Sequence, residues 1–313
     1  MSLSQIAACA MMIRPAAFGF NPEAAASNAM QKPMQADAQL VQLRAAQEFD
    51  AAVAALSGAG VRLSVQPDSV EPVKPDAIFP NNWISLHADG TLVLYPMQSA
   101  ARRPERRREV IDAVIDETGF QVTRMLDLSR HEQSGEFLEG TGSLVLDHPR
   151  RTAYACRSAR TSEALVERWC SLMGYEPVVF DATDKAGRPY YHTNVMLSIG
   201  SDWVVVAMEA IDSRDRDDVM RALEISGRTV QRVDRGAVDR FACNILELTG
   251  LNANGERQSV LAMSAAANAA LQEARVAPAL CAGKTPLAVP IPTIEHCGGG
   301  SIRCMIAEVF AAL

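Results

Sequence analysis

The chain carries one clear strand pair at Tyr191-His192-Thr193-Asn194-Val195-Met196-Leu197-Ser198-Ile199, which continues through Gly200-Ser201-Asp202 into Trp203-Val204-Val205-Val206-Ala207. A short polar segment, here called the lead, followed by an apolar run, a brief turn and a second apolar run is typical of two paired strands. The lead places His192 and Asn194 at the start of the first strand. This unit is the template against which the rest of the sequence is compared.

The same order of lead, strand, turn and strand recurs along the chain. It is found at residues 79–95, where Asp89-Gly90 is a strong hairpin signal, and again at 138–156 and 243–263. A fifth unit starts at residue 304 and has one strand only. The leads fall about 50 to 60 residues apart, at Asn82, Glu139, His192, Asn244 and Cys304.

Helical periodicity fills most of the gaps between these units, at residues 38–57, 105–118, 162–173, 212–226 and 264–273. Repeats that cannot bury their own apolar faces predict an α/β ring with helices outside, strands inside and every lead at the centre. The apolar segment 7–13 would complete the fifth unit and close the ring. Coincidental spacing in an ordinary mixed sheet is the alternative. We expect one domain over residues 1–313, because no Pro/Gly/Ser-rich linker divides the chain.

Composition limits the classes of function. The chain has 313 residues, 48% of them hydrophobic, and a formal net charge of -7, which argues against nucleic-acid binding. Its basic run, residues 102–108, is broken by a carboxylate and is expected to be a solvated helix start, although one or two arginines there would suit a substrate carboxylate. No apolar run has the length needed to cross a membrane. Seven cysteines without a CxxC pair favour neither disulfides nor a zinc site, and fit a reducing cytoplasm.

The segment 295–307, EHCGGGSIRCMIA, places Cys304 at the start of an apolar strand behind three glycines. Glycines let the backbone approach a ligand closely, so this position suits a thiolate nucleophile. A buried core cysteine is the alternative interpretation. Cys297, beside His296, is a rival nucleophile and ranks second because it precedes the glycines.

Three of the leads supply a nucleophile, a base and a carboxylate: Cys304, His192 and Glu139. A lone histidine on a strand is more often a core residue, and a glutamate beside a glycine can cap a turn. Their equivalent positions in successive repeats favour a catalytic set.

Four motifs extend this set: Gly-Gly-Gly-Ser-Ile-Arg-Cys ending at Cys304, Leu-Glu-Gly-Thr-Gly around Glu139, His-Thr-Asn from His192 and Phe-Pro-Asn-Asn around Asn82. With them the chain resembles the pentein superfamily of guanidine-modifying enzymes, which includes arginine deiminases, dimethylarginine dimethylaminohydrolases and amidinotransferases. Within it, the amidinotransferase-related branch with citrulline-utilising hydrolases is most similar. The resemblance implies a five-bladed α/β propeller with no metal and no organic cofactor.

The resemblance also implies roles for individual residues. Cys304 would be the nucleophile, His192 the general acid and base, and Glu139 the carboxylate that holds the imidazole. Arg103 or Arg106 would match the arginine that binds the substrate α-carboxylate.

Two positions depart from the arginine-deiminase pattern, in which acidic residues clasp the guanidinium cation. Here these positions are Asn82 and Asn194, and Asn244 joins them as an expected substrate-binding amide. A buried cation without carboxylate partners is costly, whereas a neutral ureido group suits amides that donate and accept. The substitutions favour citrulline, although Asp76 would serve as a carboxylate for a cation.

We therefore expect a cysteine-dependent hydrolase that converts citrulline to ornithine through a covalent intermediate. Arginine or methylarginine hydrolysis and amidinotransfer are the alternatives, and a non-catalytic propeller that binds a partner is a remote one. The expected partner is a small amino-acid substrate, without nucleic acid or membrane, and assembly with further copies of the chain is left open. Residues 16–32 are the candidate for a mobile segment near the mouth of the ring.

Overall fold

The computed structural model describes residues 3–311, and its strands form three-stranded units with one topology. In each unit the first strand pairs antiparallel with the second, and the second pairs parallel with the third. Four units, in chain order, are β3 (Ile84–Leu86), β4 (Thr91–Leu94) and β5 (Arg124–Asp127); β6 (Val145–Asp147), β7 (Thr152–Cys156) and β8 (Glu176–Phe180); β9 (Leu197–Ile199), β10 (Trp203–Val206) and β11 (Thr229–Arg232); and β12 (Leu246–Leu251), β13 (Arg257–Ser264) and β14 (Thr285–Val289).

The fifth unit joins the two ends of the chain. Strand β15 (Ala307–Val309) pairs antiparallel with β1 (Cys9–Arg14), which pairs parallel with β2 (Arg62–Pro67). Strand β15 also contacts β3 in parallel, so that two units merge into the sheet β2-β1-β15-β3-β4-β5. The prediction that the N-terminal apolar segment completes the fifth unit is confirmed.

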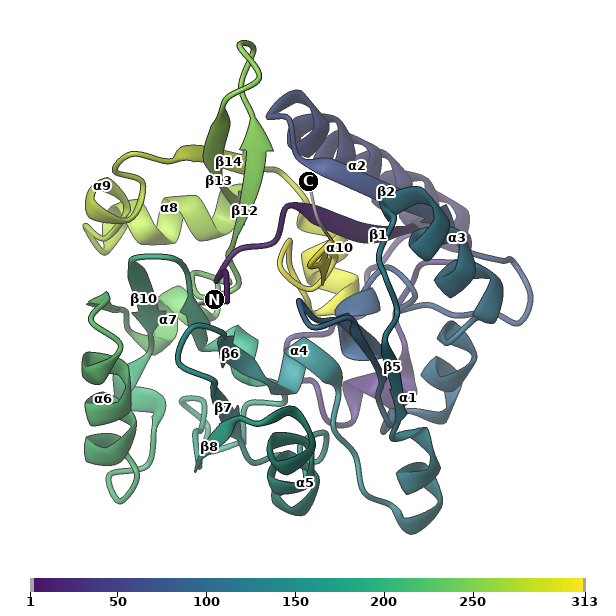
Figure 1. Cartoon of the computed structure of the whole chain (residues 1–313). Coiled ribbons are helices and arrows are strands. Elements are labelled where there is room, and N and C mark those ends of the chain that lie inside the picture. The colour runs from purple at the N-terminus through teal and green to yellow at the C-terminus, as the bar shows by residue number, and fades with distance from the viewer. Residues whose placement is uncertain (1–2, 312–313) are drawn as a thin grey trace.

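The connection between the second and third strands of each unit contains one helix of nine or more residues, as parallel strands require. These helices are α2 (Ala38–Gly58), α3 (Arg108–Thr118), α5 (Glu163–Met173), α6 (Arg216–Ile225) and α8 (Ala265–Glu273). Their apolar faces are buried, and glycines in the left-handed region end α3 and α5, at Gly119 (φ 68°) and Gly174 (φ 71°). Figure 1 shows the helices at the outside and the strands nearer the centre.

Three details differ from the sequence-based expectation. The repeats are not strand pairs, because each has a third, outer strand such as β5 or β11, whose largely exposed side chains give no apolar run. The helix expected from residue 105 begins at Arg108, since residues 100–105 form the 3-10 helix η2 (Ala100–Glu105). Cys304 does not start a strand, and it lies in the turn that precedes β15.

No helix among residues 3–311 combines the length and the apolar character that a membrane span needs.

Candidate active site

The lead residues lie in buried turns that precede the first strand of each unit. Asn82 is the last residue of the 3-10 helix η1 (Pro80–Asn82), and Glu139 directly precedes the short helix α4 (Gly140–Ser143). His192 directly precedes the 3-10 helix η4 (Thr193–Val195), which contains Asn194. Helix α4 contacts both η1 and η4. The tight turns therefore bring three successive leads together, as the repeat predicts.

A small cavity lies where these turns meet. The predicted site residues Cys304, His192, Asn82 and Asp76 line it. Ala24, Asn28 and Gln31 also line it, so the segment expected near the mouth of the ring covers the site, in part with helix α1 (Pro22–Ala25).

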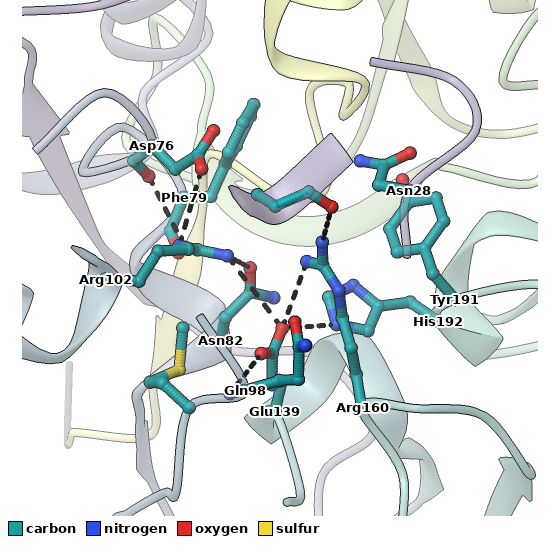
Figure 2. A network of polar contacts seen from close by, with 12 residues as sticks. Asn28, Asp76, Phe79, Asn82, Gln98, Arg102, Glu139, Arg160, Tyr191 and His192 are labelled. Carbon is teal, nitrogen blue, oxygen red and sulfur yellow. Dashed lines mark hydrogen bonds and ion pairs between the residues drawn. The ribbon is translucent and has the colours of Figure 1, made fainter. Parts of the chain in front are cut away.

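His192 and Glu139 form a hydrogen-bonded pair behind this cavity. Nε2 of His192 donates to Oε2 of Glu139 over 2.8 Å, and both side chains are buried (Figure 2). Burial lowers the pKa of His192 to about 4, against the opposing effect of Glu139. The imidazole is neutral at pH 7, with its proton on Nε2, and Nδ1 is left with a lone pair that can accept a proton.

Glu139 remains a carboxylate because charged and polar groups surround it. Nη1 of Arg160 lies 3.3 Å from its Oε2, and the backbone N–H of Gln98 donates to its Oε1 over 3.0 Å. Burial alone would raise the pKa of Glu139, but Arg160 and His192 outweigh it and hold that pKa well below its ordinary value. The carboxylate therefore fixes the histidine tautomer and stabilises an imidazolium when one forms.

The glycines of the Leu-Glu-Gly-Thr-Gly motif make this close packing possible. Gly140 has φ 49°, and a Cβ there would lie 2.2 Å from the carbonyl oxygen of Asn81. A Cβ at Gly142 would lie 2.6 Å from Nδ2 of Asn82 and 2.7 Å from Nδ1 of His192. The absence of both side chains lets the Asn82 turn approach His192.

Cys304 contacts two amide side chains. Nδ2 of Asn244 lies 3.2 Å from its Sγ, and Nδ2 of Asn194 lies 3.7 Å away. Asn194 and Asn244 are thus placed against the sulfur, and neither lines the cavity. Cys297 is buried outside the cavity, and burial raises its pKa, whereas Cys304 lines the cavity.

Two buried arginines that the sequence analysis did not assign to the site line the cavity (Figure 2). Arg102 forms an ion pair with Glu105 at 2.8 Å and donates from Nη1 to Oδ1 of Asn82, also at 2.8 Å. Arg160 holds Glu139, and its guanidinium lies 5.3 Å from the centre of the Tyr191 ring. Arg102 is the sequence neighbour of Arg103, one of the two arginines predicted to bind the substrate carboxylate. No sequence motif contains Arg160.

Arg103 and Arg106 are not brought to the cavity, contrary to expectation. Arg103 lies 3.3 Å and Arg106 2.7 Å from the carboxylate of Glu132, on the outer side of helix η2. Successive side chains on a helical turn point in different directions, so Arg102 faces the cavity while Arg103 and Arg106 do not.

Asp76 supplies a carboxylate to the cavity. Asn21 and Gln31 donate to it over 2.7 and 2.9 Å, and Nε of Arg102 lies 3.9 Å away. Burial raises the pKa of Asp76, although Arg102 opposes this. Among residues 3–311, no group of three or more His, Cys, Asp or Glu side chains is arranged to hold a metal ion.

A cysteine and a histidine at one cavity, with a carboxylate behind the histidine, are residue types that hydrolases with a cysteine nucleophile use. Residues 14–311 match the family "N,N dimethylarginine dimethylhydrolase, eukaryotic". The chain belongs to this family and thereby to the pentein enzymes. No curated protein sequence matches the chain.

Solved structures share the fold. The N-terminal domain of ArgZ, an arginine dihydrolase of the ornithine-ammonia cycle in Cyanobacteria, was solved with substrate; it is 17% identical, has a TM-score of 0.69, and the match covers 97% of this chain and 98% of that one. A dimethylarginine dimethylaminohydrolase adduct with 4-chloro-2-hydroxymethylpyridine is 13% identical, with a TM-score of 0.64 and coverages of 97% and 100%. AgrE with L-arginine is 17% identical, with a TM-score of 0.69 over 96% of this chain and 40% of that one.

Proposed function

We propose that the protein hydrolyses the ureido or guanidino C–N bond of an arginine-related amino acid through a covalent intermediate at Cys304, with citrulline as preferred substrate and ornithine as product. The observation that carries the preference is the charge of the cavity wall. Arg102 and Arg160 line it, and Asp76 is the one carboxylate among the described lining residues. A guanidinium cation would need a counter-ion there, but the charges of the two arginines are already paired with Glu105 and Glu139 and add none, whereas a neutral ureido group needs no counter-ion.

Asp76 is already engaged, which strengthens this argument. Its oxygens accept from Asn21 and Gln31 and lie near Arg102. A substrate cation would have to compete with these groups for the carboxylate. Arg102 and Arg160 also bond protein groups, and the N–H groups that they have left would receive the substrate carboxylate, in the role expected for Arg103 or Arg106.

Asn82 suits the ureido oxygen. Its Oδ1 accepts from Arg102 and one N–H of its Nδ2 donates to Oδ1 of Asn81 over 3.0 Å, so the second N–H is left to face Gly142 and the His192 ring. A donor at this place stabilises the oxygen of a ureido group as negative charge develops on it.

The chemistry then follows from the three catalytic groups. Cys304 gives its proton to Nδ1 of His192, and the sulfur attacks the ureido carbon. The bond to the terminal nitrogen breaks, ammonia leaves with the proton that His192 returns, and a thiocarbamate joins carbon to sulfur. A water gives one proton to His192 and attacks this carbon, the C–S bond breaks, the thiol is restored, and the released carbamate decomposes to ornithine and carbon dioxide.

Arginine or methylarginine is the second candidate substrate. The matched family is named for dimethylarginine, and the similar ArgZ structure is that of an arginine dihydrolase. Release of Asp76 from its present partners would provide a counter-ion for the cation. The same Cys304 and His192 would act, and the first products would be citrulline and an amine.

We extend the proposal to the fold and the compartment. The five like-built units of the described chain, joined end to end by β1 and β15, support a five-bladed propeller that forms one catalytic domain over residues 1–313. All seven cysteines are free, which supports a reducing, cytoplasmic location.

Product analysis by mass spectrometry tests the function. The purified protein is incubated separately with citrulline, arginine and dimethylarginine, beside Cys304→Ser and, as the matched control, Cys297→Ser. We expect ornithine from citrulline with the wild type and Cys297→Ser, and none with Cys304→Ser. Turnover of arginine or dimethylarginine instead would refute the charge argument, and turnover only with an added amine acceptor would identify a transferase. A lack of turnover under all of these conditions would favour a binding protein.

A further inference from the structure

Asn244 has the shortest polar contact with the nucleophilic sulfur. Its Nδ2 lies 3.2 Å from Sγ of Cys304, and the residue is fully buried just before β12. The second amide, Asn194, is 3.7 Å away and already donates to the carbonyl oxygen of Thr141 over 3.1 Å. Among residues 3–311, the side-chain hydrogen bonds of this sulfur are to these two asparagines.

The backbone fixes the orientation of the Asn244 amide. Its Nδ2 also faces the carbonyl oxygen of Asn194 at 3.2 Å, and a carbonyl oxygen can only accept. The opposite amide orientation would set two oxygens against each other. The group that meets the sulfur is therefore an N–H donor, which suits a thiolate better than a thiol.

A donor at this position answers an electrostatic need. Cys304 is 3% exposed, so negative charge that develops on its sulfur is shielded from bulk water. A hydrogen bond to the charged form favours it. Oδ1 of Asn244 is buried and has no hydrogen-bond partner among the described residues, so the amide is not held by competing bonds on its other side.

We infer that Asn244 is a catalytic residue that stabilises the thiolate of Cys304 through its Nδ2–H group, rather than a residue that binds the substrate. The inference rests on the proposed function only in that Cys304 is the nucleophile. Asn244 donates to the sulfur when the proton leaves for His192, and again when the C–S bond of the intermediate breaks.

The experiment measures the ionisation of Cys304 without turnover. Ultraviolet absorbance of the thiolate is titrated against pH, and the same titration of Cys304→Ser is subtracted. Asn244→Ala removes the donor, and Asn244→Asp replaces it with a negative charge. We expect the midpoint to rise in both variants, by about one pH unit or more for Asn244→Asp, which corresponds to about tenfold less thiolate at neutral pH.

Asn254→Asp is the matched control, because Asn254 is exposed in the turn between β12 and β13 and receives the same new charge. Its midpoint should equal that of the wild type. Thermal unfolding shows which variants are folded, and Asn244→Ser replaces either one that is not. An unchanged midpoint in folded Asn244 variants would overturn the inference.

The result is separable from the substrate assignment. A shifted midpoint in a protein that does not hydrolyse citrulline would keep Asn244 as the thiolate donor and refute only the substrate. Hydrolysis of citrulline with an unchanged midpoint would keep the function and refute the role of Asn244.

Discussion

The side-chain oxygen of Asn82 accepts a hydrogen bond from Nη1 of Arg102 over 2.8 Å, and both side chains are at most 2% exposed. The arginine thereby sets the orientation of the amide, whose Nδ2 lies toward Gly142 and His192. A carboxylate at this position would present an acceptor where the amide presents a donor.

Asn82→Asp is expected to shift the preference from citrulline towards arginine. The new carboxylate would pair with a guanidinium and repel the developing charge on a ureido oxygen. We expect kcat/KM for citrulline to fall by about 10- to 1000-fold, as for other lost oxyanion donors, with a smaller fall or a gain for arginine. Steady-state kinetics with both substrates measures the ratio, and an unchanged ratio would contradict the role given to Asn82.

Gly142→Ala should reduce activity without unfolding the protein. The added Cβ would meet Nδ1 of His192 and Nδ2 of Asn82 at 2.7 and 2.6 Å, so one of them must move. A misplacement of a catalytic group by about 1 Å lowers kcat by about 100-fold. Gly58→Ala, at the end of α2 with open space around it, is the control and should keep full activity. Wild-type kcat in folded Gly142→Ala would show that the site tolerates the methyl group.

The acidic limb of the pH–rate profile should lie near pH 4. The pKa of His192 is lowered by burial to about 4, so the neutral imidazole that takes the thiol proton persists well below pH 6.5. We expect kcat/KM to lose no activity to histidine protonation between pH 7 and pH 5, and to fall as the pH approaches 4. A half-maximal point near 6.5 would mean that His192 is solvated in the working enzyme.

Two further histidines should make the fold sensitive to acid. His87 bonds Ser85 and His148 bonds Tyr175, and burial lowers their pKa values to about 4 and about 3. Because the unfolded chain binds these protons from about pH 6.5, stability is constant above that pH and falls below it.

The expected loss between pH 6.5 and about 4 is roughly 1.4 kcal/mol per pH unit for each histidine. Urea unfolding at pH 7 and pH 5 measures it, and the comparison is made with the doubly substituted His87→Gln, His148→Gln protein. The slope should be shallower in the double variant, although His192 still contributes. Equal slopes in the two proteins would show that other groups control the acid response.

Sequence periodicity was sufficient for the architecture up to the second strand of each unit. Apolar runs such as Trp203–Val206 are buried in the structure and can be recognised in the sequence, as can the amphipathic helices that connect the strands. The outer strands were missed because their side chains are largely exposed, as in β5 (Arg124–Asp127), and such a sequence also suits a loop. The pairing of β1 with β15 was predictable because no second apolar strand follows Cys304, and the N-terminal apolar segment was available to take that place.

The site was predictable where a motif carried the residue. Cys304, His192, Asn82 and Asp76 meet at one cavity, with Glu139 behind the histidine. The arginines were not predictable, because which face of a short 3-10 turn points inward depends on the phase of that turn. Arg160 reaches Glu139 from the loop after β7, and no local pattern distinguishes it from the exposed Arg157 nearby.

The pairing of β1 with β15 has a consequence for biosynthesis. On the ribosome, β1 emerges first and waits unpaired on this edge until β15, a few residues beyond Cys304, has been made. Bringing such distant segments together is the largest loop closure in the molecule, and non-local contacts of this kind form late in folding. The strand that closes the sheet and the proposed nucleophile Cys304 therefore lie in the same short segment, so a chain that lacks residues 304–309 has neither.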